Sequence, residues 1–162
     1  MRAALLLLAA TLASAGTAGA GERCAPALSI RDARAGGELA RVPLDAEAPR
    51  FATAYRHSVT GATVTDEYRI RDSRIVLVRE TFAGAGYGLA HGPNGAAERL
   101  DLQPDGRAAL TLERPIDRLV VRVGAAAENR ITEPQLLDLT RWGDGPRELA
   151  VHECPNTGTQ TP

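Results

Sequence analysis

Short segments in which apolar and polar residues alternate, each followed by a turn signal, repeat along most of this chain. Alternation with a period of two residues places the apolar side chains on one face of a strand, and no long helical stripe of apolar residues competes with it. This pattern predicts a small antiparallel all-β domain, built as a sandwich or a barrel. The segments that we expect to form strands are Ala27–Asp32, Glu38–Leu44, Phe51–Val59, Val64–Arg71, Arg74–Phe82, Arg99–Gln103, Arg107–Glu113, Arg118–Val123 and Glu148–Glu153.

The residues between these segments are typical of tight turns. Asp72-Ser73 predicts a short link between two strands, and Pro104-Asp105-Gly106 predicts a hairpin. One segment breaks the alternation: Glu133–Leu139 carries three leucines behind Pro134, which suits a single helical turn with proline at its first position. The expected fold is therefore all-β with one short helical turn.

The N-terminus has the layout of an export signal. Arg2 precedes an apolar run from Ala3 to Ala13, which is too short to span a bilayer, and small residues follow up to Ala18-Gly19-Ala20. We expect residues 1–20 to be a cleaved signal peptide and residues 21–162 to form a single all-β domain with no membrane span. The expected location is the bacterial periplasm. An uncleaved anchor or a buried helix is the alternative.

Two cysteines lie near the two ends of the expected domain. In an oxidising compartment such a pair usually forms a disulfide, so we expect Cys24 and Cys154 to be joined. On the chain-entropy model a bridge that closes most of the chain stabilises the fold by about 4 to 5 kcal/mol. Two free or metal-binding thiols are the alternative. We expect His152, which shares a strand face with Cys154, to pack beside the bridge.

Charge and motifs exclude several classes of function. The chain has 19 basic and 20 acidic residues, and the two signs are interleaved. A nucleic-acid-binding domain usually gathers a basic excess on one face, so nucleic acid is not an expected partner, and a membrane surface loses its electrostatic attraction for the same reason. The chain carries no catalytic or cofactor motif strong enough to name an activity, and we expect no cofactor.

The hairpin around Gly61 holds the first group of candidate ligand-binding residues. If Thr60 and Val64 close the turn, His57 lies across from Glu67 and Tyr55 lies across from Arg69, all on one face. A carboxylate beside an imidazole raises its basicity. We therefore expect a His–Glu pair on a rigid sheet, although such a pair can also serve only to join two strands.

A glycine-rich loop, Gly84–Gly88 and on through His91 to Gly95, holds the second group. Glycine lets backbone N–H groups approach a ligand closely, and consecutive N–H groups can hold an anion. The loop is not a nucleotide-binding fingerprint, because no helix and no Gly-Lys-Ser/Thr motif follows it. We include Gly84 and Gly86 among the ligand-binding candidates, with a plain surface loop as the alternative.

These residues together resemble a known family. Phe51, the run Tyr55–Val59, Glu67-Tyr68 and Gly84-Ala85-Gly86 are similar to the core of a bacterial domain of unknown function. Members of that family are small exported or membrane-linked proteins encoded beside TRAP-type solute transporters of the TAXI subclass. The resemblance implies an association with such a transporter, and it implies no reaction.

The function that we expect first is ligand binding or an accessory role for a TRAP-type transporter. A small carboxylate suits the predicted patch, because Arg69 and the loop amides would hold it by charge-assisted hydrogen bonds and Tyr55 would add a hydroxyl and an apolar wall. A transporter subunit is the expected protein partner. Two alternatives stay open: a metal-dependent hydrolase that uses His57, Glu67 and His91, and a purely structural partner that offers an edge strand.

Overall fold

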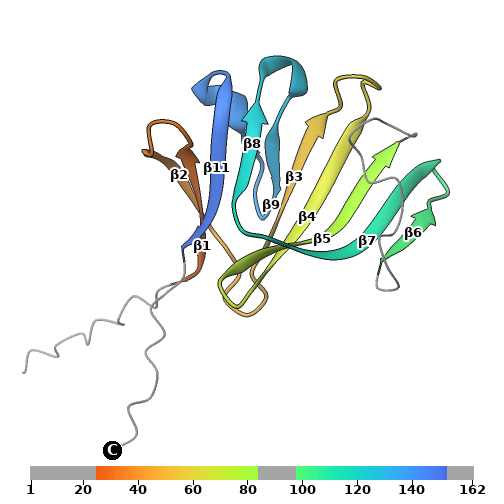
Figure 1. Ribbon diagram of the computed structural model, residues 1–162, viewed down its shortest axis with the longest axis horizontal. Coiled ribbons are helices and arrows are strands. Elements are labelled where there is room, and N and C mark those ends of the chain that lie inside the picture. Colours follow the sequence, from red (N-terminus) through yellow and green to blue (C-terminus); the bar gives the residue numbers. More distant parts are fainter. Residues whose placement is uncertain (1–24, 84–97, 153–162) are drawn as a thin grey trace, which may run out of the picture.

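Two antiparallel β-sheets form the protein in the computed structural model, which describes residues 25–83 and 98–152 (Figure 1). The all-β prediction is confirmed, the architecture is sandwich-like, and the described residues contain no α-helix. The strands are β1 (Ala27–Asp32), β2 (Glu38–Pro43), β3 (Arg50–Arg56), β4 (Thr63–Arg71), β5 (Arg74–Ala83), β6 (Arg99–Leu102), β7 (Arg107–Ile116), β8 (Leu119–Val123), β9 (Arg130–Glu133), β10 (Leu137–Asp138) and β11 (Gly145–His152), with two 3-10 helices, η1 (Ala125–Ala127) and η2 (Leu139–Trp142).

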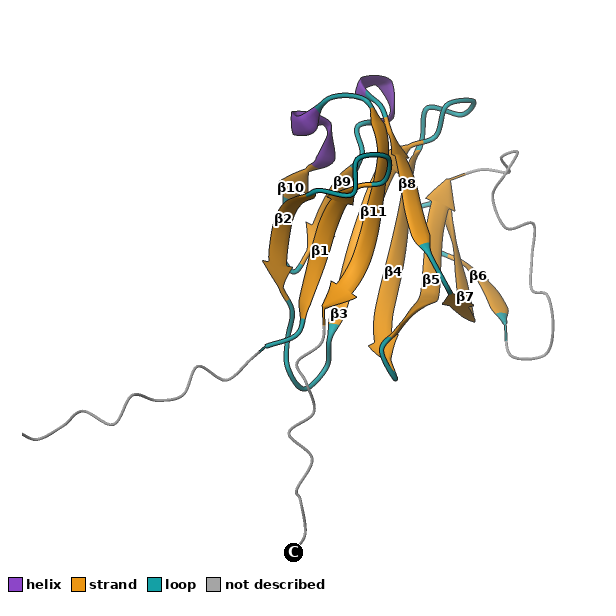
Figure 2. Ribbon diagram, turned by 60° about the vertical axis from the view of Figure 1, so that its left-hand side comes forward, coloured by secondary structure: helices purple, strands orange, loops and turns teal. Residues whose placement is uncertain are grey.

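The two sheets differ in size. The smaller sheet has four strands in the order β2-β1-β11-β8, and the larger has seven in the order β10-β9-β3-β4-β5-β7-β6. The first and last strands pair with each other, with Ala27 opposite His152. Both 3-10 helices and the β3–β4 turn lie at one end of the sandwich, and the chain enters β1 and leaves β11 at the other end (Figure 2).

Alternation explains strands such as β4, in which Val64, Tyr68 and Ile70 are buried and the residues between them are not. Leu28 and Ile30 of β1 are fully buried, as is Leu149 of β11. They belong to the same apolar cluster as Phe51 and Tyr68 of the larger sheet, whose rings stack with centroids 4.6 Å apart. Full burial of each such side chain contributes roughly 1.5–3 kcal/mol. This cluster is the core between the two sheets.

Both predicted tight turns are present. Asp72 and Ser73 have positive φ angles of 48° and 65°, as the two central residues of a type I′ hairpin turn require. At the β6–β7 turn, Gly106 has a φ of 81° and the N–H of Gln103 donates to the carbonyl of Arg107 at 2.7 Å. These turns were predictable because their geometry depends on local residue types.

The helical turn predicted at Glu133–Leu139 does not lie there but further along the chain. The Glu133–Pro134 peptide bond is cis, and Leu137–Asp138 is a short strand. The helical turn is η2, which starts at Leu139, because Asp138 caps it: its Oδ1 accepts from the backbone N–H of Thr140 at 2.8 Å. The sequence analysis also missed β9, β10 and η1, since β9 offers only one apolar residue and β10 spans only two residues.

Arg147 connects three elements beside the core. Its side chain is almost fully buried, and its guanidinium donates to Oδ2 of Asp32 at 3.3 Å and to the carbonyls of Trp142 and Gly143 at 2.8 and 2.9 Å. Gly145 has a φ of +146°, and a Cβ there would lie 3.0 Å from Nη1 of Arg147. Glycine at this position therefore leaves room for the guanidinium of Arg147, which links β11 by hydrogen bonds to the end of η2 and to β1.

Several sequence predictions lie outside the described residues: the signal peptide at residues 1–20, the cysteines Cys24 and Cys154, and the loop glycines Gly84 and Gly86. Within the described ranges, no helix is both long and apolar enough to cross a bilayer.

We expect Arg147→Lys to lower the free energy of unfolding by about 2–3 kcal/mol, because one ammonium group cannot serve Asp32 and both carbonyls together. Urea unfolding measures this change. Arg141→Lys is the matched control, since Arg141 is exposed and its guanidinium lies 5.3 Å from the centroid of the Trp142 ring, an interaction that lysine can also make. Equal losses in the two variants would contradict the role given to Arg147.

Candidate functional site

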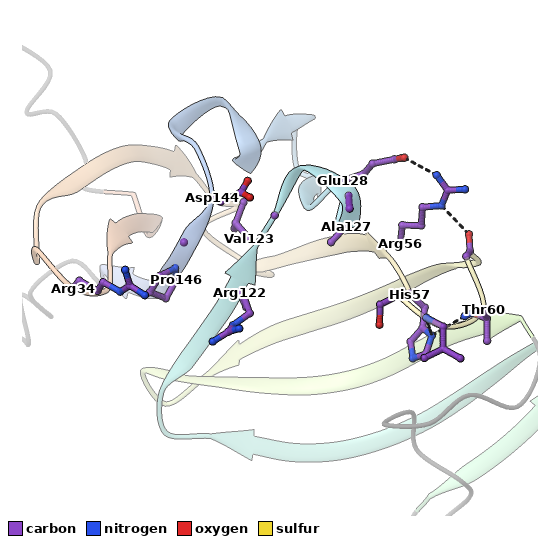
Figure 3. Close-up of a pocket in the computed structure, with 16 residues that line it drawn as sticks. Arg34, Arg56, His57, Thr60, Arg122, Val123, Ala127, Glu128, Asp144 and Pro146 are labelled. Atoms are coloured by element: carbon purple, nitrogen blue, oxygen red, sulfur yellow. Dashed lines mark hydrogen bonds and ion pairs between the residues drawn. The ribbon is translucent and has the colours of Figure 1, made fainter.

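A cleft of about 1040 Å³ lies at the end of the sandwich where the β3–β4 turn faces η1 and the start of β11 (Figure 3). It lies between the two sheets, so residues far apart in the sequence meet there. Its lining residues are Arg34, Arg56, His57, Ser58, Val59, Thr60, Gly61, Arg122, Val123, Gly124, Ala126, Ala127, Glu128, Asp144, Gly145 and Pro146.

His57 organises the turn on one side of this cleft. Its N–H donates to the carbonyl of Ala62 at 2.8 Å, which leaves a turn of residues 58–61. Its buried imidazole accepts two hydrogen bonds at Nδ1, from the backbone N–H groups of Val59 and Thr60, both at 3.3 Å. A nitrogen that accepts carries no hydrogen, so Nε2 is the ring nitrogen left to act as a donor.

The predicted register of this hairpin is wrong. Tyr55 lies opposite Val64 rather than Arg69, and Glu67 lies opposite Ala52 rather than His57. The cause is the length of the turn: His57 and Ala62 close it, whereas the prediction placed its closure at Thr60 and Val64. A register displaced by an odd number of residues moves side chains to the other face of the sheet, so the predicted four-residue patch does not form.

The predicted ligand-binding residues are consequently dispersed. His57 lines the large cleft, whereas Tyr55 lines a separate cavity between the sheets. Glu67 and Arg69 lie together in a shallow depression on the outer face, where Oε1 of Glu67 is 3.7 Å from Nε of Arg79. No group of three or more potential metal ligands forms within residues 25–83 and 98–152, and His91 lies outside them, so His57 and Glu67 do not form the start of a zinc site.

Arginine side chains line the cleft, and the sequence analysis missed them. All 19 basic residues of the chain are arginines, and three of them, Arg34, Arg56 and Arg122, reach this cleft. Arg56 already has partners within the protein: its Nη1 lies 3.2 Å from Oε1 of Glu128, and its Nε donates to the carbonyl of Gly61 at 3.2 Å. Their common location depends on tertiary structure, so no local signal marks them.

The side chains of Arg34 and Arg122, in contrast, make no ion pair and no hydrogen bond within the described part of the chain. Arg122 lies opposite Pro146 across the β8–β11 pair, and the carbonyl of Pro146 accepts from the N–H of Ala33 beside Arg34. Figure 3 shows Arg122 projecting into the space between Arg34 and His57. Asp144, which also lines the cleft, accepts from the N–H of Ala125 at 3.0 Å, and Glu128 is paired with Arg56.

A second polar group lies deeper, on the inner face of the larger sheet. Asp66 of β4 lies directly opposite Glu80 of β5 and opposite Thr53 of β3. The hydroxyl of Tyr68 donates to Oδ2 of Asp66 at 3.4 Å, and Oδ1 of Asp66 is buried with no hydrogen-bond partner among the described residues. Burial, and then the charge of Glu80, raise the pKa of Asp66 from 3.8 to about 7.

Tyrosines next to this carboxyl respond to the same environment. Burial raises the pKa of Tyr55 to about 12, and the charges of Asp66 and Glu80 add to the shift. The pKa of Tyr68 is also raised, chiefly by burial. Both tyrosines therefore stay protonated and can donate hydrogen bonds.

The raised pKa of Asp66 predicts a characteristic dependence of stability on pH. The folded protein holds this proton up to about pH 7, whereas the unfolded chain releases it near 3.8, so the free energy of unfolding falls as the pH rises through this window. We expect the fall to be on the order of 3 kcal/mol. Asp66→Asn should flatten this slope and be more stable than the wild type at pH 8.

Urea unfolding from pH 4 to pH 8 measures both effects. Asp117→Asn is the control, because Asp117 is exposed and should leave the slope unchanged. A slope that is the same in Asp66→Asn and in the wild type would show that Asp66 is ionised throughout.

Comparison with known proteins places the chain in a family. Residues 51–135 match the family model described as a domain of unknown function (DUF1850). No curated protein and no solved structure matches the chain. The matched segment contains Phe51, the run Tyr55–Val59 and Glu67-Tyr68, which carried the resemblance in the sequence, and it covers more than half of the 162 residues. The chain therefore belongs to the DUF1850 family.

Proposed function

We propose that this protein is an exported ligand-binding protein that holds a small carboxylate in the cleft between its sheets and serves a TRAP-type solute transporter. The observation that carries the proposal is Arg122, an exposed arginine without a partner among the described residues, at the centre of a cleft that also contains Arg34. A guanidinium matches a carboxylate with two parallel hydrogen bonds. The association with a transporter rests on the family resemblance alone.

His57 supports the site rather than binding in it through Nδ1. That nitrogen already accepts from the Val59 and Thr60 N–H groups and so fixes the turn that forms one wall of the cleft. The hydroxyl of Ser58, in the same turn, lines the cleft and is available to a bound carboxylate as a donor. In this proposal Arg122 takes the role that the sequence analysis gave to Arg69, which lies on the outer face.

Export and a terminal disulfide belong to the same proposal. Cys24 precedes Ala27 by three residues and Cys154 follows His152 by two, and Ala27 and His152 lie opposite each other in the β1–β11 pair. This pairing supports a bridge between the two cysteines, as expected in the periplasm. Such a bridge would join the start of β1 to the end of β11.

Edge strands give less support to a purely structural partner. The edge strand β2 carries Glu38 and Arg41, and the edge strand β6 carries Arg99 and Asp101. Charged side chains on edge strands oppose pairing with another chain. Binding in the cleft is therefore the function that the described residues support best.

We expect one class of small carboxylate to raise the melting temperature of the purified, oxidised protein. A ligand at 100 times its dissociation constant stabilises the native state by about 2.7 kcal/mol, which is a shift of several degrees. Arg122→Gln should abolish the shift, and Arg118→Gln, which removes an exposed ion pair with Glu148 outside the cleft, should keep it. His57→Ala should lower the melting temperature of the free protein.

Two results would contradict the proposal: no carboxylate shifts the wild type, or Arg122→Gln responds as the wild type does. The transporter role has its own measurement, which is purification of the tagged protein from native membranes. The membrane subunits of a TRAP-type transporter should purify with it, and their absence contradicts the accessory role while leaving carboxylate binding intact.

A further inference from the structure

A smaller cavity of about 200 Å³ lies between the two sheets, next to the cleft along β3. Its wall from the larger sheet is polar, with Thr53, Tyr55, Asp66 and Tyr68. Its wall from the smaller sheet is aliphatic. The lining residues there are Leu119, Val120 and Val121 of β8, with Leu139 of η2 closing one side and Ala54, Asn129 and Arg130 completing the lining.

The polar wall contains an unsatisfied acceptor. Oδ1 of Asp66 is buried and has no donor among the described residues, although Oδ2 receives the Tyr68 hydroxyl. A buried acceptor without a donor costs about 1–3 kcal/mol. Asp66 also lies directly opposite Glu80, whose charge adds to the rise of the Asp66 pKa. A positively charged group in the cavity would stabilise the ionised Asp66 carboxylate.

We propose that this cavity binds a primary alkylammonium ion, with its ammonium group on Asp66 and its hydrocarbon part against β8. An ammonium group has three donors, and Asp66 and Tyr55 line the same wall, where a carboxylate oxygen and a hydroxyl oxygen can accept them. The aliphatic wall of Leu119, Val120 and Val121 favours a ligand that continues into a short apolar chain. The cavity is smaller than those that hold drug-sized ligands, so the ligand is small.

A metal ion fits this cavity less well than an amine. A bare cation needs several oxygen or nitrogen ligands around it, and no three acidic, histidine or cysteine side chains gather at one point in the part of the chain that the structure describes. An aliphatic wall also contributes no ligand to a metal. The amine uses both walls, and this is why we prefer it.

Binding of a cation to Asp66 should depend on pH. The groups that face it are Glu80 from β5, Tyr55 from β3, Tyr68 from its own strand and Arg130 from β9, which lines the cavity and donates to the carbonyl of Glu128 at 3.1 Å. Strand β8 contributes no titratable group to the cavity. Since the pKa of Asp66 is raised to about 7, protons compete with the amine below that pH, and affinity should fall by up to tenfold per pH unit.

The test is calorimetric titration of the purified protein with butylammonium chloride at pH 8 and at pH 6. Butan-1-ol matches the hydrocarbon part without the charge, and sodium chloride matches the ionic strength. We expect heat of binding with butylammonium at pH 8, affinity at least fivefold weaker at pH 6, and no binding of butan-1-ol or sodium chloride at either pH.

Variants locate the site. Asp66→Asn should abolish binding, and Glu113→Gln should keep it, because Glu113 pairs with Arg71 on the outer face. Arg122→Gln should also keep it, which separates this site from the carboxylate cleft. If Asp66→Asn does not fold, nuclear Overhauser effects between the butyl chain and the methyl groups of Leu119 and Val121 in the wild type replace it.

Three outcomes would overturn the proposal. Equal binding of butan-1-ol means that the cavity is only apolar, and unchanged binding by a folded Asp66→Asn variant places the amine elsewhere. No binding at pH 8 by the folded wild type means that the cavity does not take an alkylammonium ion.

Discussion

The packing of one apolar sheet face against the other determines where every other feature of this protein lies. Leu28, Ile30 and Leu149 of the smaller sheet share a core with Phe51 and Tyr68 of the larger one. Because the smaller sheet has four strands and the larger has seven, this shared core ends partway across the larger sheet (Figure 1). Next to this core the larger sheet has a second apolar cluster, made of Val64, Phe82, Ala108, Leu110 and Leu112. Asp66 and Glu80 lie on the two strands, β4 and β5, that both clusters share.

The turn after β3 decides which side chains reach this inner face. By holding the Val59 and Thr60 N–H groups, His57 stabilises the turn of residues 58–61 and so fixes the β3–β4 register. In that register Tyr55 and His57 point inward with Val64 and Asp66, and Glu67 and Arg69 point outward. His57, which the sequence suggests as a ligand-binding residue, thus acts first on the backbone, and the shape of the proposed site depends on the turn that it holds.

Most of the strands were predictable from the sequence, because burial of one face leaves an alternating pattern in the chain itself, as in β4. The type I′ turn at Asp72-Ser73 was predictable for a similar, local reason. The β3–β4 register was not, because it depends on a turn that His57 and Ala62 close. The imidazole of His57 holds that turn together with the N–H of Gly61, which donates to the carbonyl of His57 at 2.8 Å. Arg122 was missed as well, because it reaches the cleft only when β8 pairs with β11. Whether a segment forms a strand depends largely on its own sequence, whereas the candidate site depends on contacts between strands.

The two sites that we propose lie next to each other and have opposite charge preferences. Tyr55, near the end of β3, lines the inter-sheet cavity, and His57, just after β3, lines the cleft. Packing alone does not account for Asp66 in the cavity or Arg122 in the cleft. A carboxyl group kept protonated inside the sandwich costs stability at neutral pH, and an arginine without a partner among the described residues adds none. Residues that oppose or do not aid folding cluster at functional sites. The position of Asp66 and Arg122 in the cavity and the cleft is therefore the strongest physical argument for the two proposed binding sites.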